Sequence, residues 1–316
     1  MKPSRLFLVA LPPLVAIILS IPCFRFPYLW DDLVFLRIGQ TFHASYLLPV
    51  PETIFYRPIS REIYFGLLTL FPYDGAFLAH ILNAAVLVVA IVLLNSFATR
   101  LCDFKVGFLS GLAFACLSFV PILVGWISTI QDLLAIVFIL AALQFQVGRR
   151  AGLAAFATAC AMLSKESALF LMPVLVLSHW IIGERPYRIA RNLTLYGTIA
   201  VLWAAIHPGM HLMAGRGFTG GEMRYLGLDN PGRAEFLWRS LLTLVNLPIT
   251  GLRTPWLKAG TLPLVGAALA ASVGVWALYR RGDRGRPHVR PGPRRAAVLA
   301  GLIAVIPTVL TCLTVR

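Results

Sequence analysis

Two adjacent aspartates, Asp31 and Asp32, follow the first hydrophobic stretch of the chain in the segment WDDLVFLRIG. A carboxylate at the edge of a membrane can take a proton from an acceptor hydroxyl or hold a metal ion. Neighbouring helical residues point about 100° apart, so we expect only one of the two to face a substrate. Asp32 directly precedes the apolar run 33–36, so we predict that it caps the helix and that Asp31 is catalytic. The simpler interpretation is that the pair only marks a solvated helix start.

Two short motifs, FYRP and LSKES, supply cations that suit a phosphate group. Arg57 and Lys165 can form charge-assisted hydrogen bonds to a phosphate that departs with developing negative charge. Tyr56 precedes the arginine, and Glu166 follows the lysine. The simpler interpretations are that Arg57 contacts lipid head groups and that Lys165 and Glu166 neutralise each other.

Three further polar residues lie within apolar segments or at their ends. His80 and Asn83 are three residues apart and therefore share a helix face, and Asp132 opens a later apolar segment. A polar or ionisable residue at membrane depth suggests a functional site. The simpler interpretations are hydrogen bonds between helices for His80 and Asn83 and helix capping for Asp132. A Pro-Gly dipeptide separates His207 from His211, so we interpret this histidine pair as part of a loop and not as a metal site.

The whole chain has the composition of an α-helical membrane protein that crosses the bilayer several times. Of its 316 residues, 59% are hydrophobic and 13% are charged, and the mean hydropathy is +0.80. A soluble domain carries about 25% charged residues. The net charge of +15 arises from arginines in short loops, as is typical of cytoplasmic loops. We therefore expect anionic membrane lipids as partners of the arginine-rich loop 280–295, and no nucleic acid.

Nine apolar segments are candidates for membrane spans. They cover residues 6–24, 76–98, 106–125, 130–147, 152–164, 167–183, 193–207, 259–279 and 296–314. Nine crossings with a cytoplasmic N-terminus place every basic loop in the cytoplasm.

The same topology gives one transmembrane domain over residues 1–316, with segments 25–75 and 208–258 on the outer side. The first of these contains DLVFLRIGQTFHASYLL, which predicts an interfacial amphipathic helix. We treat residues 152–183 as two short helices that meet at SKES (164–167). A single long crossing would move the arginines after residue 183 to the outer side.

Five sequence blocks occur in one order: WDDLVFLRIG, FYRPISREIYF, HILNAAVLVVAIVLL, VGWISTIQDLLAIVFILAALQF and LSKESALFLMPVL. They resemble conserved blocks of GT-C-fold membrane glycosyltransferases, especially the protein O-mannosyltransferase-like and TMTC-like proteins. The resemblance covers roughly residues 25–180 and implies an all-α, GT-C-like helical bundle. It also implies a catalytic base or metal ligand at Asp31 or Asp32, and lipid-phosphate contacts from Arg57 and Lys165. The fourth block lacks the arginine common in TMTC-like proteins, which leaves Asp132 as the matching acid.

These observations favour a glycosyltransferase that moves a sugar from a polyprenyl-phosphate donor to an acceptor hydroxyl of a glycan, lipid or protein. The reaction would take place on the outer, periplasmic face of a bacterial inner membrane, and Mg²⁺ or Mn²⁺ is a candidate cofactor. The residues assigned to the donor site are Tyr56, Arg57, His80, Asn83, Asp132, Lys165 and Glu166.

Two other classes of protein stay open. A lipid or sugar transporter or flippase would line a path with polar residues through the whole membrane. These polar residues cluster on one side, which favours the enzyme. An inactive GT-C-like assembly protein is the third class, because the chain ends where the similar proteins continue through further spans and we expect a C-terminal truncation.

Overall fold

The structure of the protein, a computed structural model, describes residues 3–40, 47–49, 54–71, 75–117, 119–171, 175, 178 and 186–215. This part of the chain is helical and contains no strand. Its elements are α1 (Pro3–Ser20), η1 (Ile21–Arg25), α2 (Trp30–Gln40), η3 (Pro58–Ile63), α3 (Tyr64–Leu68), α4 (Gly75–Leu101), α5 (Phe104–Ala115), α6 (Val120–Gly125), η4 (Ile127–Thr129), α7 (Ile130–Val147), α8 (Ala151–Ser164), η5 (Glu166–Leu171), α10 (Pro186–Ile206) and α11 (Pro208–Gly215). Element η3 is a π-helix, whereas η1, η4 and η5 are 3₁₀-helices.

Four described helical segments are long and apolar enough to cross a membrane, which makes this an all-α membrane protein. They are Leu8–Arg25, Gly75–Leu101, Ile127–Val147 and Arg188–Ile206. Helices α5 and α8 contain 12 and 14 residues. At 1.5 Å per residue they rise only about 18 and 21 Å, less than the hydrocarbon core of about 30 Å.

The four long segments coincide with predicted spans, whereas the predicted span 106–125 is not one helix. It divides into α5 and α6, and Pro121 stands in the first turn of α6. Proline lacks the backbone N–H that would continue a helix but is well suited to start one. The predicted spans 259–279 and 296–314, much of the predicted span 167–183 and residues 216–258 of the predicted outer segment 208–258 lie outside the described residues. The count of nine spans therefore stays a prediction.

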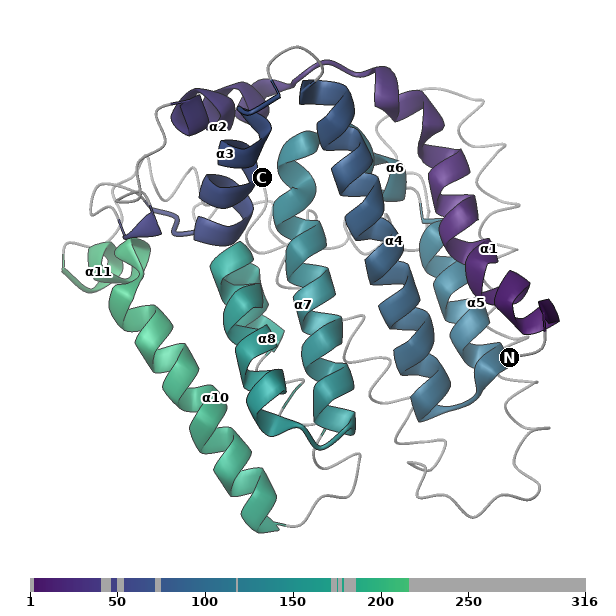
Figure 1. Cartoon of the computed structure of the whole chain (residues 1–316). Coiled ribbons are helices and arrows are strands. Elements are labelled where there is room, and N and C mark those ends of the chain that lie inside the picture. Colours follow the sequence, from purple (N-terminus) through teal and green to yellow (C-terminus); the bar gives the residue numbers. More distant parts are fainter. Residues whose placement is uncertain are drawn as a thin grey trace, which may run out of the picture.

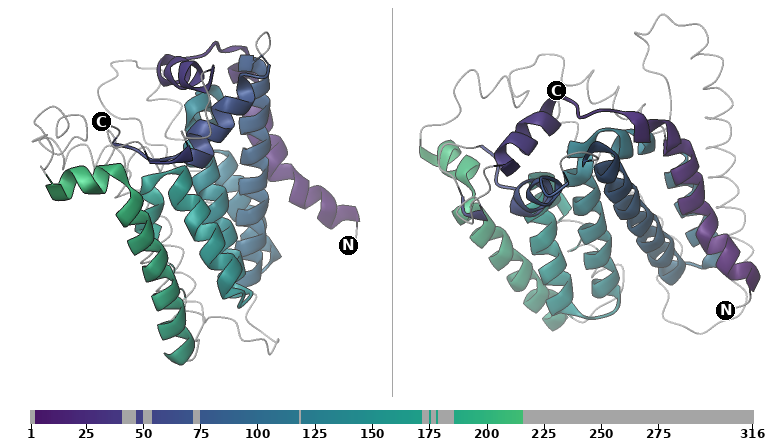
Figure 2. Two further views of the ribbon diagram at one scale, coloured as in Figure 1. Left: turned by 60° about the vertical axis from the view of Figure 1, so that its left-hand side comes forward. Right: turned by 45° about the horizontal axis from the view of Figure 1, so that its top comes forward.

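Helix α4 lies at the centre of the described bundle, in contact with α1, α5 and α7, and the row continues from α7 through α8 to α10 (Figures 1 and 2). Leu87 and Ile91 of α4 are fully buried against side chains that include Leu133 of α7. Helices α4 and α5 approach closely at Gly107. A Cβ atom there would lie 2.5 Å from the carbonyl oxygen of Asn95, so any larger residue would push the two helices apart.

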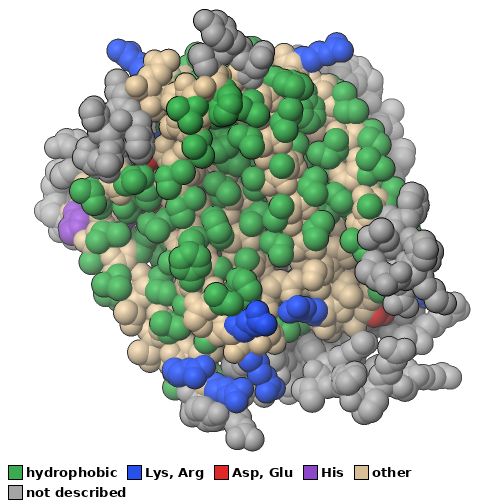
Figure 3. Space-filling view, in the orientation of Figure 1, with side chains coloured by type: hydrophobic (Ala, Val, Ile, Leu, Met, Phe, Trp, Pro, Cys, Tyr) green, Lys and Arg blue, Asp and Glu red, His purple; other side chains and the backbone are tan. Residues whose placement is uncertain are grey.

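The two ends of the bundle differ in charge. Arg100 ends α4, Lys105 begins α5, Arg149 and Arg150 join α7 to α8, and Arg188 lies in the first turn of α10. The helix ends that carry these residues lie together at the lower end of the bundle in Figure 1. Figure 3, drawn in the orientation of Figure 1, shows apolar side chains over the middle of the molecule and several basic side chains below them. The segments with the candidate site residues lie at the other end.

Part of the segment 25–75 packs into the apolar core of the bundle, which is not expected of an outer loop. Helix α2 exposes Trp30, Leu33 and Val34 on one face, as expected for an amphipathic helix, although residues 41–46 of the predicted helix are outside the described part. Helix α3 was not predicted. Its Phe65 and Leu68 are essentially fully buried and belong to the same apolar cluster as α4.

Candidate functional site

Asp32 is completely buried and serves as a link between two helical segments. Its Oδ2 accepts a hydrogen bond from the backbone N–H of Leu29 at 2.9 Å, which satisfies a free donor at the start of α2 in the manner of a capping box. Its Oδ1 accepts from the backbone N–H of Ser128 at 2.7 Å. Asp32 therefore has the capping role expected for it and also fixes α2 to η4.

Asp31 has the opposite environment. Its side chain is exposed, and within the described residues it forms no hydrogen bond or ion pair. Together with Leu29, Trp30 and Trp126 it lines an open hollow of about 370 Å³, which we call the aspartate hollow. Trp30 has a φ of 29°, a backbone conformation that is unfavourable for a bulky residue and that often occurs at functional sites.

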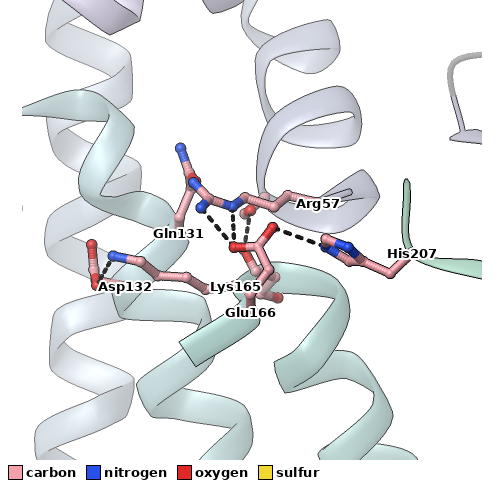
Figure 4. A network of polar contacts seen from close by, with 8 residues as sticks. Arg57, Gln131, Asp132, Lys165, Glu166 and His207 are labelled. Atoms are coloured by element: carbon pink, nitrogen blue, oxygen red, sulfur yellow. Dashed lines mark hydrogen bonds and ion pairs between the residues drawn. The ribbon is translucent and has the colours of Figure 1, made fainter. Parts of the chain in front are cut away.

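Arg57 and Glu166 form the central contact of a polar network that we call the ion-pair cluster (Figure 4). The cluster consists of Arg57, Gln131, Asp132, Lys165, Glu166 and His207. Oε2 of Glu166 lies 2.7 Å from Nε and 2.6 Å from Nη2 of Arg57. Nη1 of Arg57 donates to the side-chain oxygen of Gln131, and the guanidinium carbon lies 4.3 Å from the centre of the Phe55 ring. The arginine is thus held by partners from several segments.

Lys165 pairs with Asp132 and not with the adjacent Glu166. Its Nζ lies 2.5 Å from Oδ1 of Asp132, which joins the end of α8 to the first turn of α7. The side chains of Lys165 and Asp132 are 19% and 34% exposed, so water still reaches this pair. The structure therefore brings together four of the predicted donor-site residues, but as two neutral pairs.

His207 also belongs to the cluster, although from the sequence we interpreted it as part of a loop. It follows α10, is buried and places Nε2 3.5 Å from Oε1 of Glu166. Its ring stacks against Trp203 with 4.4 Å between the ring centres. His211 points elsewhere, with Nε2 against the carbonyl oxygen of Ala205. The loop interpretation of this stretch is wrong, because Pro208 and Gly209 begin helix α11, which contains His211. The role of His207 was not predicted because its partner, Glu166, is 41 residues away.

The two carboxylates at the heart of these sites have shifted pKa values in opposite directions. Burial raises the pKa of Asp32, even though hydrogen bonds from the Leu29 and Ser128 segments act against it. Burial alone would also raise the pKa of Glu166, but the Arg57 charge and hydrogen bonds from His207 and Arg57 outweigh it and lower this pKa to about 2. Glu166 is therefore a stable anion at neutral pH.

His80 and Asn83 form hydrogen bonds to the backbone of α6, of the residue after η1 and of η4. The ring nitrogens of His80 lie 2.7 Å from the carbonyl oxygen of Val124 and 2.9 Å from that of Phe26. Both hydrogens of the Asn83 amide are directed at backbone carbonyls, those of Leu123 and Ile127. Both side chains therefore form hydrogen bonds between helical segments, which was the simpler of the two interpretations of His80 and Asn83 from the sequence.

Tyr56 donates a hydrogen bond to the carbonyl oxygen of Leu47 at 2.7 Å, away from the cations of the cluster. A carboxylate that the sequence analysis did not select, Glu62, lies nearby in the π-helix. Oε1 of Glu62 pairs with Arg61 at 2.5 Å, whereas its buried Oε2 has no hydrogen-bond partner within the described residues. Burial raises the pKa of Glu62 against the effect of Arg61. Glu62 was not among the residues predicted from the sequence, because it becomes buried only where η3 packs against α7 and α8.

Polar side chains are also buried between the helices towards the basic end of the bundle. Tyr196 of α10 donates to Gln146 of α7, and Gln144 of α7 donates to the carbonyl oxygen of Leu93 in α4. From the sequence, the polar residues were expected to cluster at the opposite end. These residues hold helices together through hydrogen bonds.

A metal site is not apparent in the described part of the chain, where no group of three His, Cys, Asp or Glu side chains could hold an ion. The predicted Mg²⁺ or Mn²⁺ therefore has no defined set of ligands here. Comparison of the chain with protein-family models, curated proteins and solved structures yields no match.

Proposed function

We propose that the protein is a membrane glycosyltransferase that takes a sugar from a polyprenyl-phosphate donor and transfers it to a hydroxyl group. In this proposal Asp31 is the general base that removes the acceptor proton. Arg57 and Lys165 stabilise the negative charge that develops on the departing lipid phosphate. The reaction takes place at the end of the bundle opposite the basic loops, which is the outer face of the membrane by the positive-inside rule.

One observation carries the proposal: Asp32 ties the helix of the unpaired Asp31 to the segment that leads directly into the ion-pair cluster. The hydrogen bond to Ser128 fixes α2 against η4, and η4 continues into α7, whose first turn holds Gln131 and Asp132. A catalytic carboxylate and phosphate-binding cations must keep a fixed relation for transfer to occur. The link through Asp32 supports such a relation.

The surroundings of Asp31 suit a reacting hydroxyl. The carboxylate is exposed and has no described partner that would compete for a proton. Trp30 and Trp126 give the aspartate hollow a largely apolar surface with one charged group, a combination of side chains found in small-molecule sites. The apolar surface of α10 near the cluster, with Val201 and Leu202 at 68% and 60% exposure, suits a lipid chain.

A direct test is to incubate the purified full-length protein with polyprenyl-phosphate sugars of several kinds and an acceptor mixture, and to measure cleavage of the donor. We expect cleavage by the wild type, and a rate lower by a factor of about 10² or more for Asp31→Asn. Asp103→Asn is the matched control, because Asp103 caps α5 at the basic end of the bundle. Parallel reactions with Mg²⁺, Mn²⁺ or EDTA test for a metal requirement.

Two outcomes would contradict the proposal. Equal rates for the wild type and Asp31→Asn would remove the carboxylate from the reaction. Movement of intact donor across vesicle membranes without cleavage would support the transporter or flippase instead.

A further inference from the structure

The guanidinium of Arg57 is already bound to an anion. Two of its nitrogens converge on Oε2 of Glu166 at 2.6 and 2.7 Å, and the third nitrogen donates to Gln131. A carboxylate and a phosphate use the same charge-assisted geometry on arginine. A phosphate that uses Arg57 must therefore replace the Glu166 carboxylate or share the arginine with it.

Charge makes replacement more favourable than sharing. The cluster holds two cations, Arg57 and Lys165, and two carboxylates, Glu166 and Asp132. A phosphate added to this neutral set would bring uncompensated negative charge into a partly buried site, where repulsion between like charges is only weakly screened. Movement of Glu166 away from the guanidinium increases the distance between the carboxylate and the phosphate, which weakens their repulsion and leaves both donor nitrogens to the phosphate.

His207 is placed to receive the released carboxylate. Its Nε2 already faces Oε1 of Glu166 at 3.5 Å, and its buried Nδ1 has no hydrogen-bond partner within the described residues. The turn after His207 packs against the segment before Arg57: a Cβ atom on Gly209 would lie 2.5 Å from the carbonyl oxygen of Ile54. The segments that carry His207 and Arg57 are thus in contact with each other.

We propose that Glu166 is an internal competitor that occupies the phosphate-binding face of Arg57, and that a lipid phosphate displaces it towards His207. This inference rests on the proposed function for the identity of the anion, a polyprenyl phosphate. It changes the role of Glu166 from a residue that binds the donor to one that opposes binding.

The test is the affinity of the full-length protein for polyprenyl phosphate, which carries no sugar and requires no turnover. Glu166→Gln keeps the size of the side chain and an oxygen that accepts from Arg57, but loses the charge. We expect it to bind polyprenyl phosphate about tenfold more tightly than the wild type, because one charge-assisted competitor is gone. The double variant Arg57→Ala, Glu166→Gln should show no gain, and Asp103→Asn should bind as the wild type does.

Equal or weaker binding by a folded Glu166→Gln variant would overturn the proposal, because a purely structural ion pair predicts loss and not gain. Glu166→Asp, which withdraws the carboxylate by one methylene group, should give a smaller gain and serves if the first variant does not fold. A gain for polyprenyl phosphate but not for inorganic phosphate assigns the site to the lipid, and a gain for both assigns it to phosphate in general.

Failure of the proposed function would look different. Tighter binding by Glu166→Gln without cleavage of any sugar donor would uphold the competition and contradict the transferase. Cleavage of a sugar donor by the wild type, together with no gain in affinity for polyprenyl phosphate in Glu166→Gln, would support the transferase and contradict the competition.

Discussion

The aspartate hollow and the ion-pair cluster lie at the same end of the bundle but treat their charges in opposite ways. In the hollow, Asp31 is exposed and without a described partner, while Asp32 is buried and held by backbone N–H groups. In the cluster, Arg57 and Lys165 are each paired with a carboxylate. The hollow therefore has a group that is ready to accept a proton, whereas the cluster must exchange a partner before it binds a new anion.

The largest effect should follow from loss of the unpaired carboxylate. Asp31→Asn should lower the rate of sugar transfer by a factor of about 10²–10⁴, the usual contribution of a general base. The melting temperature should change little, because the side chain forms no hydrogen bond or ion pair within the described residues. Turnover and thermal unfolding are measured on the same preparation. If Asp31→Asn transferred sugar at the rate of the wild type, the hollow would have no catalytic role.

Loss of the central cation should have the next largest effect. Arg57→Ala should weaken binding of polyprenyl phosphate by a factor of about 10–100, because a charge-assisted contact is lost and Glu166 remains as a repelling anion. Equilibrium binding with purified protein measures this change. Lys165→Ala should have a smaller effect, because an ammonium offers a phosphate a single point charge and not the two parallel N–H donors of a guanidinium. Equal effects of the two substitutions would contradict the central position of Arg57.

Asp32→Ala should act on stability and not directly on chemistry. It leaves the buried backbone N–H of Ser128 without an acceptor, at a cost of about 1–3 kcal/mol. The N–H of Leu29, which is only partly buried, also loses its acceptor at a smaller cost. Thermal unfolding in detergent should show the loss. Turnover per folded molecule should also fall, because the link to Ser128 is cut, but by less than in Asp31→Asn, because Asp32 positions the base and does not react. An unchanged melting temperature together with lost turnover would exchange the roles of the two aspartates.

The two regions should also respond to pH with opposite signs. Arg57 lowers the pKa of Glu166 from 4.5 to about 2, so the stability due to this group is present above pH 4.5 and is lost as the pH falls towards 2. Burial raises the pKa of Asp32, so its contribution is present at low pH and is lost as the pH rises through the raised pKa.

Unfolding measured across this acid range tests both signs. Between pH 4.5 and 2, the Glu166→Gln variant should lose less stability than the wild type. As the pH rises, the Asp32→Asn variant should lose less stability than the wild type. A stability profile that neither substitution changed would show that other groups set it.

The long apolar helices and several residues of the candidate site could be predicted from the sequence. The ion pairs that these residues form could not. Hydropathy identified α4 and α7, because a long apolar run suits a helix that crosses the bilayer regardless of its neighbours. The FYRP and LSKES motifs indicated Arg57, Lys165 and Glu166 as candidate site residues. They did not predict that Arg57 would pair with Glu166, 109 residues away, because such a contact depends on which helix ends meet.

The same reason explains the other differences. His207 and Glu62 acquire their environments only when α10 and η3 pack against the bundle. The break between α5 and α6 was missed because the hydropathy of the predicted span 106–125 stays high through Pro121. Short helices that are buried by tertiary contacts, such as α3, carry no periodic signal long enough to separate them from a loop.

The π-helix Pro58–Ile63 makes this region unusually sensitive to a change in chain length. A π-turn accommodates one residue more than an α-helical turn, and each helical residue turns the chain by about 100°. Arg57 precedes this turn and joins the ion-pair cluster, whereas Phe65 follows it and enters the apolar core. Deletion of a single codon within the turn would therefore leave Arg57 and Phe65 unable to reach their partners at the same time. A one-residue deletion here should be less well tolerated than any conservative substitution in the same turn.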